Sequence, residues 1–347
     1  MAITMKDIAR DLGVSVVTVS KVLRNHSDIS AETRKRVLHR MKELNYQPNP
    51  AARTLVSGRT NLIGLIVPDL VHPFFAQVAK GISAKLRTEE YSLIISSSED
   101  DAALEGREIN QMLARRVDAL ILASTQSGVE NLRRIEDSGI PCVLLDRKID
   151  GLKASFVGID DELAGSMATT HLLDIGCKVV AYIAGSDVST SWDRQRGYSK
   201  TLASKGFHLV PEYIVRHGHG DDSGDEVGFA GMQQLLMLSP RPDGVFCCND
   251  PIAMGAMRAI LGAGLRIPGD VAVIGCGNVH YADFLRVPLT SIDQDSNALG
   301  TSAAKLALSI IKRKTETAPK SLFLPAKLVI RASTQRQENQ TGPATTK

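Results

Sequence analysis

The sequence lacks the features that mark membrane, secreted and metal-binding proteins. No apolar run approaches the roughly 18 residues that a membrane-spanning helix needs. The first residues, MAITMKDIARDLG, are polar and helix-patterned, without the apolar stretch and small-residue cleavage site of a secretory signal peptide. The five cysteines show no C-x-x-C spacing and the eight histidines no metal-ligand spacing. We therefore expect a cytoplasmic protein with reduced, buried thiols, no metal and no membrane association.

Motifs of the common α/β enzymes are also missing. The chain has no G-x-G-x-x-G, no G-x-x-x-x-G-K-[ST] and no G-x-S-x-G sequence. These motifs bind dinucleotides, cradle phosphates or hold a nucleophilic serine. We expect neither a cofactor nor enzymatic activity, and an α/β enzyme stays open only as an alternative that a turnover assay would test.

Charge is distributed unevenly along the chain. Residues 1–59 hold eleven Lys/Arg against five Asp/Glu, a net charge of +6. The remaining residues carry a net charge of −3, since the whole chain is +3. A small basic segment on a mildly acidic body indicates a polyanionic partner for that segment alone.

The basic segment is patterned as three short helices. Thr4, Ser15 and Ser30 are suitable N-caps, and Gly13 can end the first helix in a left-handed turn. Two short helices joined by a Gly-Val-Ser turn, with a third completing a small core, are typical of a helix-turn-helix unit. We assign residues 1–47 to a DNA-binding domain.

The second helix of this unit is expected to contact bases. Val19, Val22 and Leu23 form its inward apolar stripe. Valine methyl groups can contact thymine methyl groups in the major groove, and a lysine can reach guanine. The alternative is that the two valines at its start belong to the core of a small bundle. Its opposite face carries Val16, Val17, Ser20 and Lys21.

A second short helix is predicted within residues 48–59. In NPAARTLVSG, Asn49 is a suitable N-cap and Pro50 suits the first helical position. So short a helix is marginal alone. With Leu55 as an apolar wedge beside Arg53, it suits a hinge segment that folds in the minor groove and opens a base step. An ordinary linker helix packed on the body is the alternative.

The stretch 4–58 closely resembles the LacI/GalR family of bacterial repressors, through VSVVTVSKVL, KELNYQP and NPAARTL. The resemblance continues to about residue 335. It implies dimers that bind near-palindromic double-stranded operators. It also implies that Leu55 intercalates, with Ala52 and Arg53 on the minor-groove side. The residues that it places at the major groove and its phosphates are Ser15, Val16, Val17, Thr18 and Lys21.

After Arg59 the pattern changes to short apolar runs that alternate with amphipathic stretches. Runs that are apolar on both faces and separated by helices indicate parallel sheets covered on both sides. The expected strands are 62–67, 91–96, 118–123, 141–145, 155–159, 179–184, 243–248 and 271–275. The expected helices are about 75–88, 103–115, 128–138, 161–175, 193–204, 226–238 and 251–263.

Polar residues collect where these strands end. Parallel sheets bind ligands outside the carboxyl ends of their strands, so the groups converge on one crevice suited to a small polar ligand. Singly, each residue could instead cap a helix or satisfy a loop. The groups are Asp69 to Phe75, Asp146 with Arg147, residues 185–198, Asn249 with Asp250, and residues 275–278.

The resemblance implies a periplasmic-binding-protein-like body at residues 60–335, with two α/β lobes joined by three crossovers. Lobe one would be about 60–160 plus 293–320, and lobe two 161–292 plus 321–335. The tail, 336–347, is polar and expected to be disordered. The residues matching the family's effector contacts are Phe74, Asp146, Arg194 and Asn249, with Asp69 nearby; to these we add Trp192 as a stacking platform.

We therefore expect a small all-α DNA-binding head followed by a two-lobed α/β body with parallel sheets. The predicted function is a dimeric repressor whose operator affinity a small-molecule effector controls. A sugar is the family's usual ligand, but Gly277 stands where the family commonly has a ligand-gripping Asp. A periplasmic-type receptor is the other alternative. Such a receptor would need an export signal, and it would have no use for a DNA-reading head. Whether the effector releases or promotes binding is left open.

Overall fold

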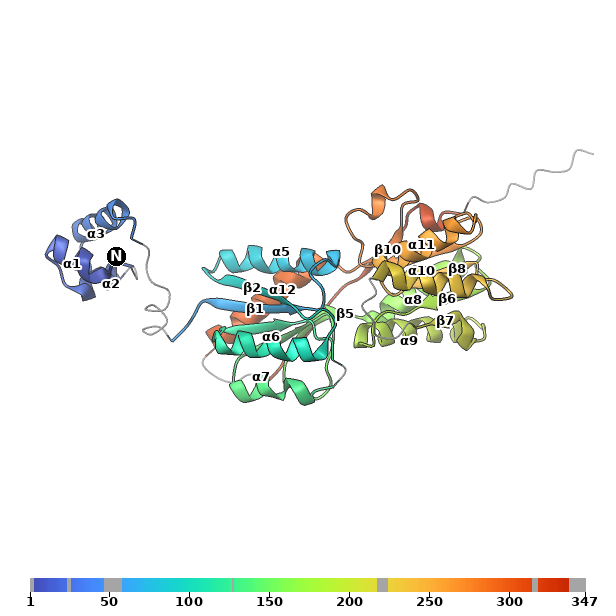
Figure 1. Ribbon diagram of the computed structural model, residues 1–347, viewed down its shortest axis with the longest axis horizontal. Coiled ribbons are helices and arrows are strands. Elements are labelled where there is room, and N and C mark those ends of the chain that lie inside the picture. The colour runs from blue at the N-terminus through green and yellow to red at the C-terminus, as the bar shows by residue number, and fades with distance from the viewer. Residues whose placement is uncertain are drawn as a thin grey trace, which may run out of the picture. The chain divides into compact units, whose positions relative to one another are not determined.

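The computed structural model describes residues 3–23, 26–46, 58–126, 128–216, 224–313 and 318–336 (Figure 1). The chain divides into two compact units, Met1–Thr60 and Asn61–Lys347. The predicted hinge residues Ala52, Arg53 and Leu55, and residues 337–347 of the predicted disordered tail, lie outside the described residues. Arg336, where that tail was predicted to begin, is ordered instead, because its Nη2 donates to the carbonyl oxygen of Asp243. None of the described helices combines the length and the apolar character that crossing a membrane requires.

The described part of the first unit holds the three predicted helices, α1 (Met5–Leu12), α2 (Val16–Leu23) and α3 (Ala31–Glu43). Thr4 caps α1 in a capping box, because Thr4 Oγ1 accepts from the backbone N–H of the third helical residue while that residue's carboxylate accepts from Thr4 N. Gly13, at φ 64°, turns the chain toward α2. The inward side chains form one small core of Ile8, Ala9, Val19, Val22, Val37 and Met41.

The second unit is built on two sheets of six described strands each. The first sheet is parallel throughout and has the order β11-β5-β4-β3-β1-β2. The second has the order β12-β10-β9-β8-β6-β7, in which only β12 runs antiparallel to its neighbour. The strands of the first sheet are β1 (Leu62–Val67), β2 (Ser92–Ser97), β3 (Ala119–Leu122), β4 (Cys142–Leu145), β5 (Ser155–Ile159) and β11 (Ser321–Leu324). Those of the second are β6 (Val180–Ile183), β7 (Ile214–Val215), β8 (Gly244–Cys247), β9 (Ala272–Cys276), β10 (Thr290–Asp293) and β12 (Lys327–Val329).

Helices cover both faces of each sheet (Figure 1). In β1, Ile63 and Leu65 pack into the core beneath α5 and α12, whereas Ile66 packs into the core beneath α6 and α7. This alternation explains why the strand is apolar at every position. The helices are α5 (Pro73–Arg87), α6 (Ala102–Ala114), α7 (Arg133–Ser138), α8 (Asp161–Asp174), α9 (Ser189–Ser204), α10 (Gly224–Leu236), α11 (Asp250–Gly262) and α12 (Ser296–Lys312). Short 3-10 turns occur at Glu130–Leu132, Pro211–Tyr213, Ala282–Phe284 and Ala332–Thr334.

The chain passes between the two lobes three times. It leaves lobe one after β5, returns after β10 to form α12 and β11, and leaves again after β11. The third crossover therefore follows Leu324, and the predicted boundary at residue 320 is wrong. The physical reason is that β11 is an edge strand, with Leu322 and Phe323 about half exposed. The strand is only four residues long and half of its apolar surface faces solvent, so its short apolar run could not be distinguished from a loop in the sequence.

Two glycines bring α8 and α9 into backbone contact. A Cβ on Gly165 would lie 2.1 Å from the carbonyl oxygen of Arg194, and one on Gly197 would lie 2.0 Å from that of Glu162. Any larger side chain at either position would force the helices apart. The close approach places Asp161, at the start of α8, beside Arg194 on α9.

Candidate functional site

The exposed face of α2 is the candidate DNA-reading surface. Val17 is 62% exposed and Val16 38% exposed, whereas Val19 and Val22 are buried in the core of the first unit. The alternative that both valines belong to this core is therefore wrong. Two apolar side chains held out to solvent near the start of a helix are available for contact with base edges.

Polar groups at both ends of α2 fix its geometry. Ser15 Oγ accepts from Thr18 N at 3.0 Å, so Ser15 caps the helix as predicted. Lys21 forms an ion pair with Asp28 that keeps the pKa of this carboxyl below its usual range through a hydrogen bond from the ammonium. Both partners are solvent-exposed, so a phosphate or guanine can replace the carboxylate at small cost. Ser20, half-buried, lies between these two ends.

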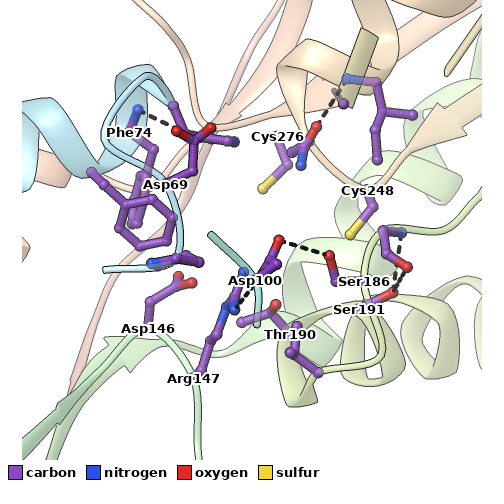
Figure 2. Close-up of a pocket in the computed structure, with 18 of the residues that line it drawn as sticks. Asp69, Phe74, Asp100, Asp146, Arg147, Ser186, Thr190, Ser191, Cys248 and Cys276 are labelled. Carbon is purple, nitrogen blue, oxygen red and sulfur yellow. Dashed lines mark hydrogen bonds and ion pairs between the residues drawn. The ribbon is translucent and has the colours of Figure 1, made fainter. Parts of the chain in front are cut away.

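The second unit contains a cavity of about 410 Å³ between its two lobes (Figure 2). Its walls come from segments that follow β1, β2 and β4 in lobe one and β6, β8 and β9 in lobe two. The sequence prediction that polar groups at strand ends converge on one crevice is therefore confirmed. The lining residues that carry the argument are Asp69, Phe74, Asp100, Asp146, Arg147, Arg194, Asn249, Cys248 and Cys276.

Five of the six predicted effector residues line this cavity: Asp69, Phe74, Asp146, Arg194 and Asn249.

Trp192 does not line the cavity, and its predicted stacking role is wrong. It is 46% exposed, its indole N–H donates to Asp187, and the Arg216 guanidinium lies 3.5 Å from its ring centroid. The physical reason is helical geometry. Trp192 and Arg194 are two residues apart on α9, so their side chains leave the helix on nearly opposite sides. Because Arg194 faces the cavity, Trp192 faces away from it.

Arg194 is held in the cavity wall by several hydrogen bonds. Its Nη2 lies 2.7 Å from Asp161 Oδ1, and its Nη1 donates to the carbonyl oxygen of Cys248 at 2.7 Å. Nη2 also lies 3.4 Å from Oε1 of Gln294, a residue just beyond β10 where the chain returns to lobe one. Burial raises the pKa of Asp161 and the adjacent guanidinium opposes this rise. The pair is buried and mutually neutralising.

Asp146 differs from Arg194 in that its carboxylate forms no hydrogen bond within the described part of the chain. Among the described residues no donor lies within hydrogen-bond distance of its side chain, although its backbone N–H donates to Val157 O at 2.8 Å. The residue is buried, and its φ of 64° directs the chain sharply out of β4. Burial raises the pKa of this carboxyl, against the attraction of Arg194 and Arg147. Such a carboxylate can accept hydrogen bonds from a ligand's hydroxyl groups.

The polar residues at the ends of β1 and β8 combine two roles. Asn249 caps α11, since its Oδ1 accepts from Ile252 N at 2.9 Å, and it also lines the cavity. Asp69 accepts from Val71 N at 2.6 Å and likewise lines the cavity. The capping or loop role and the cavity role are therefore compatible. Asp250 points elsewhere and accepts hydrogen bonds from Ser291 and Val279.

His72 caps α5 at the edge of the cavity. Its Nδ1 accepts a hydrogen bond from Phe74 N at 3.3 Å, so this nitrogen carries no proton. Burial lowers the pKa of His72 from its ordinary value of 6.5 to about 4, while Asp69 opposes the shift. The imidazole therefore adds no positive charge to the cavity at neutral pH.

Lowering the pH from 7 to 4 is expected to cost up to about 3 kcal/mol of unfolding free energy through His72. Its pKa is lower in the folded chain than the ordinary 6.5, so the unfolded chain binds the proton first. The contribution is complete above pH 6.5 and is lost as the pH falls toward 4. Between pH 7.5 and 4.5, urea unfolding should show that His72→Asn, which retains a capping side chain, loses less unfolding free energy than the wild type. His208→Asn, at an exposed position, should follow the wild type; equal slopes for all three proteins would contradict the assignment.

Some cavity residues were not among the predicted effector contacts. Arg147 directly follows Asp146, and the strand-end pattern includes both residues. Only Asp146 matches an effector contact of the family, so Arg147 was not predicted to bind the effector. Asp100 was not predicted, although the polar sequence SSSEDD at the end of β2 follows the same strand-end rule. Cys248 and Cys276 add two thiols at the ends of β8 and β9. All five cysteines of the chain are buried and unpaired.

The described residues hold no group of three or more His, Cys, Asp or Glu side chains arranged to bind a metal ion. What the cavity offers is hydrogen bonding from two lobes, through Asp146 and Arg147 on one side and Arg194 and Asn249 on the other. A helical DNA-reading unit and a two-lobed body with a polar cavity define a ligand-responsive DNA-binding regulator.

Comparison with known proteins gives the family. Residues 4–49 match bacterial regulatory proteins of the lacI family, and residues 169–334 match the periplasmic binding protein-like domain. The chain belongs to the lacI family of bacterial regulatory proteins. The predicted fold class, a helix-turn-helix head on a periplasmic-binding-protein-like body with parallel sheets, is confirmed.

Its relatives are transcriptional regulators. The chain is 36% identical over 331 residues to a ribose operon repressor from Haemophilus influenzae, which covers 95% of this chain and 98% of the relative. It is 31% identical over 338 residues to catabolite control protein A from Priestia megaterium, across 96% of this chain and 100% of the relative. The structure of the Lac repressor dimer bound to operator and the anti-inducer ONPF matches with a TM-score of 0.84 at 28% identity, covering 96% and 99% of the two chains. A LacI family regulator from Enterococcus faecium with bound ribose matches with a TM-score of 0.69 at 26% identity, covering 78% and 98%.

Proposed function

We propose that the chain is a cytoplasmic, dimeric repressor that binds a near-palindromic operator and whose operator affinity is controlled by a small polar effector. The observation that carries this proposal is the pairing of Asp146 and Arg194 in one cavity. They come from opposite lobes, and the Asp146 carboxylate has no donor among the described protein residues. A ligand with hydroxyl groups would satisfy it and connect the two lobes.

DNA recognition is assigned to the first unit. Val16 and Val17 would contact bases, while Lys21 and the Ser15 end of α2 would contact bases or phosphates. The resemblance to operator-bound relatives supports this assignment. The minor-groove roles of Ala52, Arg53 and Leu55 are part of the same proposal and rest on the sequence alone.

Effector and operator are proposed to be coupled through the lobes. Closure or twisting of the lobes on the effector would shift the lobe-one surfaces of two paired chains and change the separation of their hinge segments. Operator affinity then follows by thermodynamic linkage. An effector that favours the operator-binding conformation raises this affinity, and one that favours another conformation lowers it. The sign of the response distinguishes an inducer from a corepressor.

We further propose that the chain has no catalytic activity of its own. Arg194 is already paired with Asp161 and hydrogen-bonded to Cys248. No general acid or base among the described residues is hydrogen-bonded to the Asp146 carboxylate, so the cavity suits binding rather than catalysis. A receptor role would leave the helix-turn-helix unit without a purpose.

The proposal is tested by selecting bound DNA from a random pool, with and without D-ribose and related sugars. Ribose is included because a relative is named a ribose operon repressor and a structural neighbour contains it. Recovery of a palindromic sequence would support a dimeric DNA reader. A failure to enrich any sequence would contradict it, and a ligand-dependent shift in enrichment would identify the effector and its sign.

Val17→Gln is expected to change the operator sequence that the protein selects. Glutamine can form two hydrogen bonds with adenine, whereas valine offers methyl contact to thymine, and each such contact discriminates by about 1–3 kcal/mol. Leu38→Gln is the matched control, because Leu38 is a similarly exposed aliphatic residue on α3. The control should select the wild-type sequence; the same selected sequence for Val17→Gln would show that this residue does not read bases.

A further inference from the structure

Arg147 is held in the cavity wall with part of its guanidinium unused. Its Nη1 donates to the carbonyl oxygen of Ser124 and to Asp100 Oδ1, both at 3.1 Å. The side chain is only 10% exposed and lies over the Phe75 ring. No acceptor among the described residues lies within hydrogen-bond distance of its Nε or Nη2. The guanidinium is therefore oriented in advance. Its Nε is buried, but its Nη2 still has hydrogen-bond donors for a ligand.

Asp100 contacts Arg147 on one side and the opposite lobe on the other. Its Oδ1 pairs with Arg147, and its Oδ2 accepts from Ser186 Oγ at 3.3 Å (Figure 2). Ser186 belongs to the segment after β6 in lobe two. Asp100 thus neutralises the Arg147 charge in the part of the cavity lining where the two lobes are in contact. Its φ of 50° is a conformation that Asp and Asn tolerate better than most residues.

The charge balance of the cavity is negative. The two guanidiniums in its lining are already paired, Arg194 with Asp161 and Arg147 with Asp100. Four further carboxylates in the lining form no ion pair with a cationic side chain among the described residues, and the neutral His72 ring does not compensate them. In a partly enclosed site such charges act at low effective dielectric and repel anions strongly. These carboxylates are Asp69, Glu99, Asp146 and Asp101, the last of which caps α6.

We propose that the Asp100–Arg147 pair determines the charge class of the effector, so that the cavity takes an uncharged polyol and rejects its phosphate ester. This inference rests on the proposed function of the cavity as the effector site. Hydroxyl groups donate to Asp146 and accept from Arg147, which is the two-way hydrogen bonding that a neutral polyol provides. A phosphate group needs an unpaired cation, and Asp100 removes the one that Arg147 could supply. The cavity volume of about 410 Å³ lies near the lower end of ligand pockets, which span roughly 300–1,000 Å³, and suits a small ring.

The test compares each neutral sugar with its own phosphate ester by calorimetry on the full chain. The probes are D-ribose with ribose 5-phosphate and D-glucose with glucose 6-phosphate. In the wild type, at least one neutral sugar should bind and its ester should bind at least about tenfold more weakly. Asp100→Asn keeps the size of the side chain and frees the Arg147 charge, so it should narrow this difference by about tenfold.

Asp137→Asn is the matched control, an exposed carboxylate on α7 outside the cavity lining, and it should leave the difference unchanged. The inference is overturned if an ester binds as tightly as its parent sugar, if no neutral probe binds, or if Asp100→Asn leaves the difference as it is. DNA selection separates the two proposals. A chain that enriches an operator but binds no neutral probe contradicts only the charge-class inference, whereas a chain that enriches no DNA contradicts the proposed function.

Discussion

Arg194→Met is expected to lower the free energy of unfolding of the second unit by about 3–5 kcal/mol and to abolish effector binding. The reason is the burial of its partner. Asp161 is 1% exposed, and without Arg194 its carboxylate would be left in the interior with no cation beside it. The loss should be smaller at pH 5 than at pH 8. Removing the guanidinium that opposes the effect of burial raises the pKa of Asp161 further. At pH 5 the folded variant therefore holds this carboxyl in its protonated, uncharged form, whereas at pH 8 it must either bury the charge or bind a proton at a cost.

The double variant Arg194→Met/Asp161→Leu separates stability from binding. Replacing a buried ion pair by apolar side chains of similar size is often nearly neutral, so most of the lost stability should return. Effector binding should not return, because the guanidinium on the cavity wall is still absent. Urea unfolding and calorimetry measure the two quantities. If the double variant were as unstable as the single one, the uncompensated charge would not be the cause.

Asp146→Asn is expected to weaken effector binding by about 10- to 100-fold, because a charge-assisted hydrogen bond is worth about 1.5–3 kcal/mol. The same change should raise the stability of the ligand-free protein by up to about 1 kcal/mol, since it removes a buried charge that has no hydrogen-bond donor. Asparagine also tolerates the φ of 64° at this position. Opposite signs for stability and affinity are the signature of a residue kept for ligand binding.

Operator binding measured without effector provides the control for Asp146→Asn. It should match the wild type, while any effector-dependent change in operator affinity is lost at wild-type effector concentrations. A variant that lost stability and retained the full effector response would show that Asp146 is structural.

Much of the fold could be predicted because its signals are local. The caps Thr4, Ser15 and Ser30 lie next to the residues that they cap, and a buried parallel strand such as β1 is apolar at every position. The short edge strands β11 and β12 carry exposed residues and give no such signal. The helix α12 was also not predicted, although Leu299, Ala303 and Ala307 recur at helical spacing on its buried face.

The site could be predicted as a set of loops but not as a set of contacts. The strand-end rule indicated which segments meet, and it correctly brought Asp146 and Asn249 to one cavity. The rule could not indicate the direction of each side chain, and the side chain of Trp192 faces away from the cavity. It also could not predict the Asp100–Arg147 pair, because these residues are 47 positions apart and meet only through the order of β2, β1, β3 and β4 in the sheet.

The three passages of the chain between the lobes have a mechanical consequence. A single connection would leave lobe two free to rotate about it, whereas three separate connections between the same two lobes restrict how the lobes can move relative to each other. Gln294 lies in one of these connections and accepts a hydrogen bond from Arg194, so it links that connection to the cavity wall. The body therefore has few ways to deform, and a molecule of a few atoms can select among them.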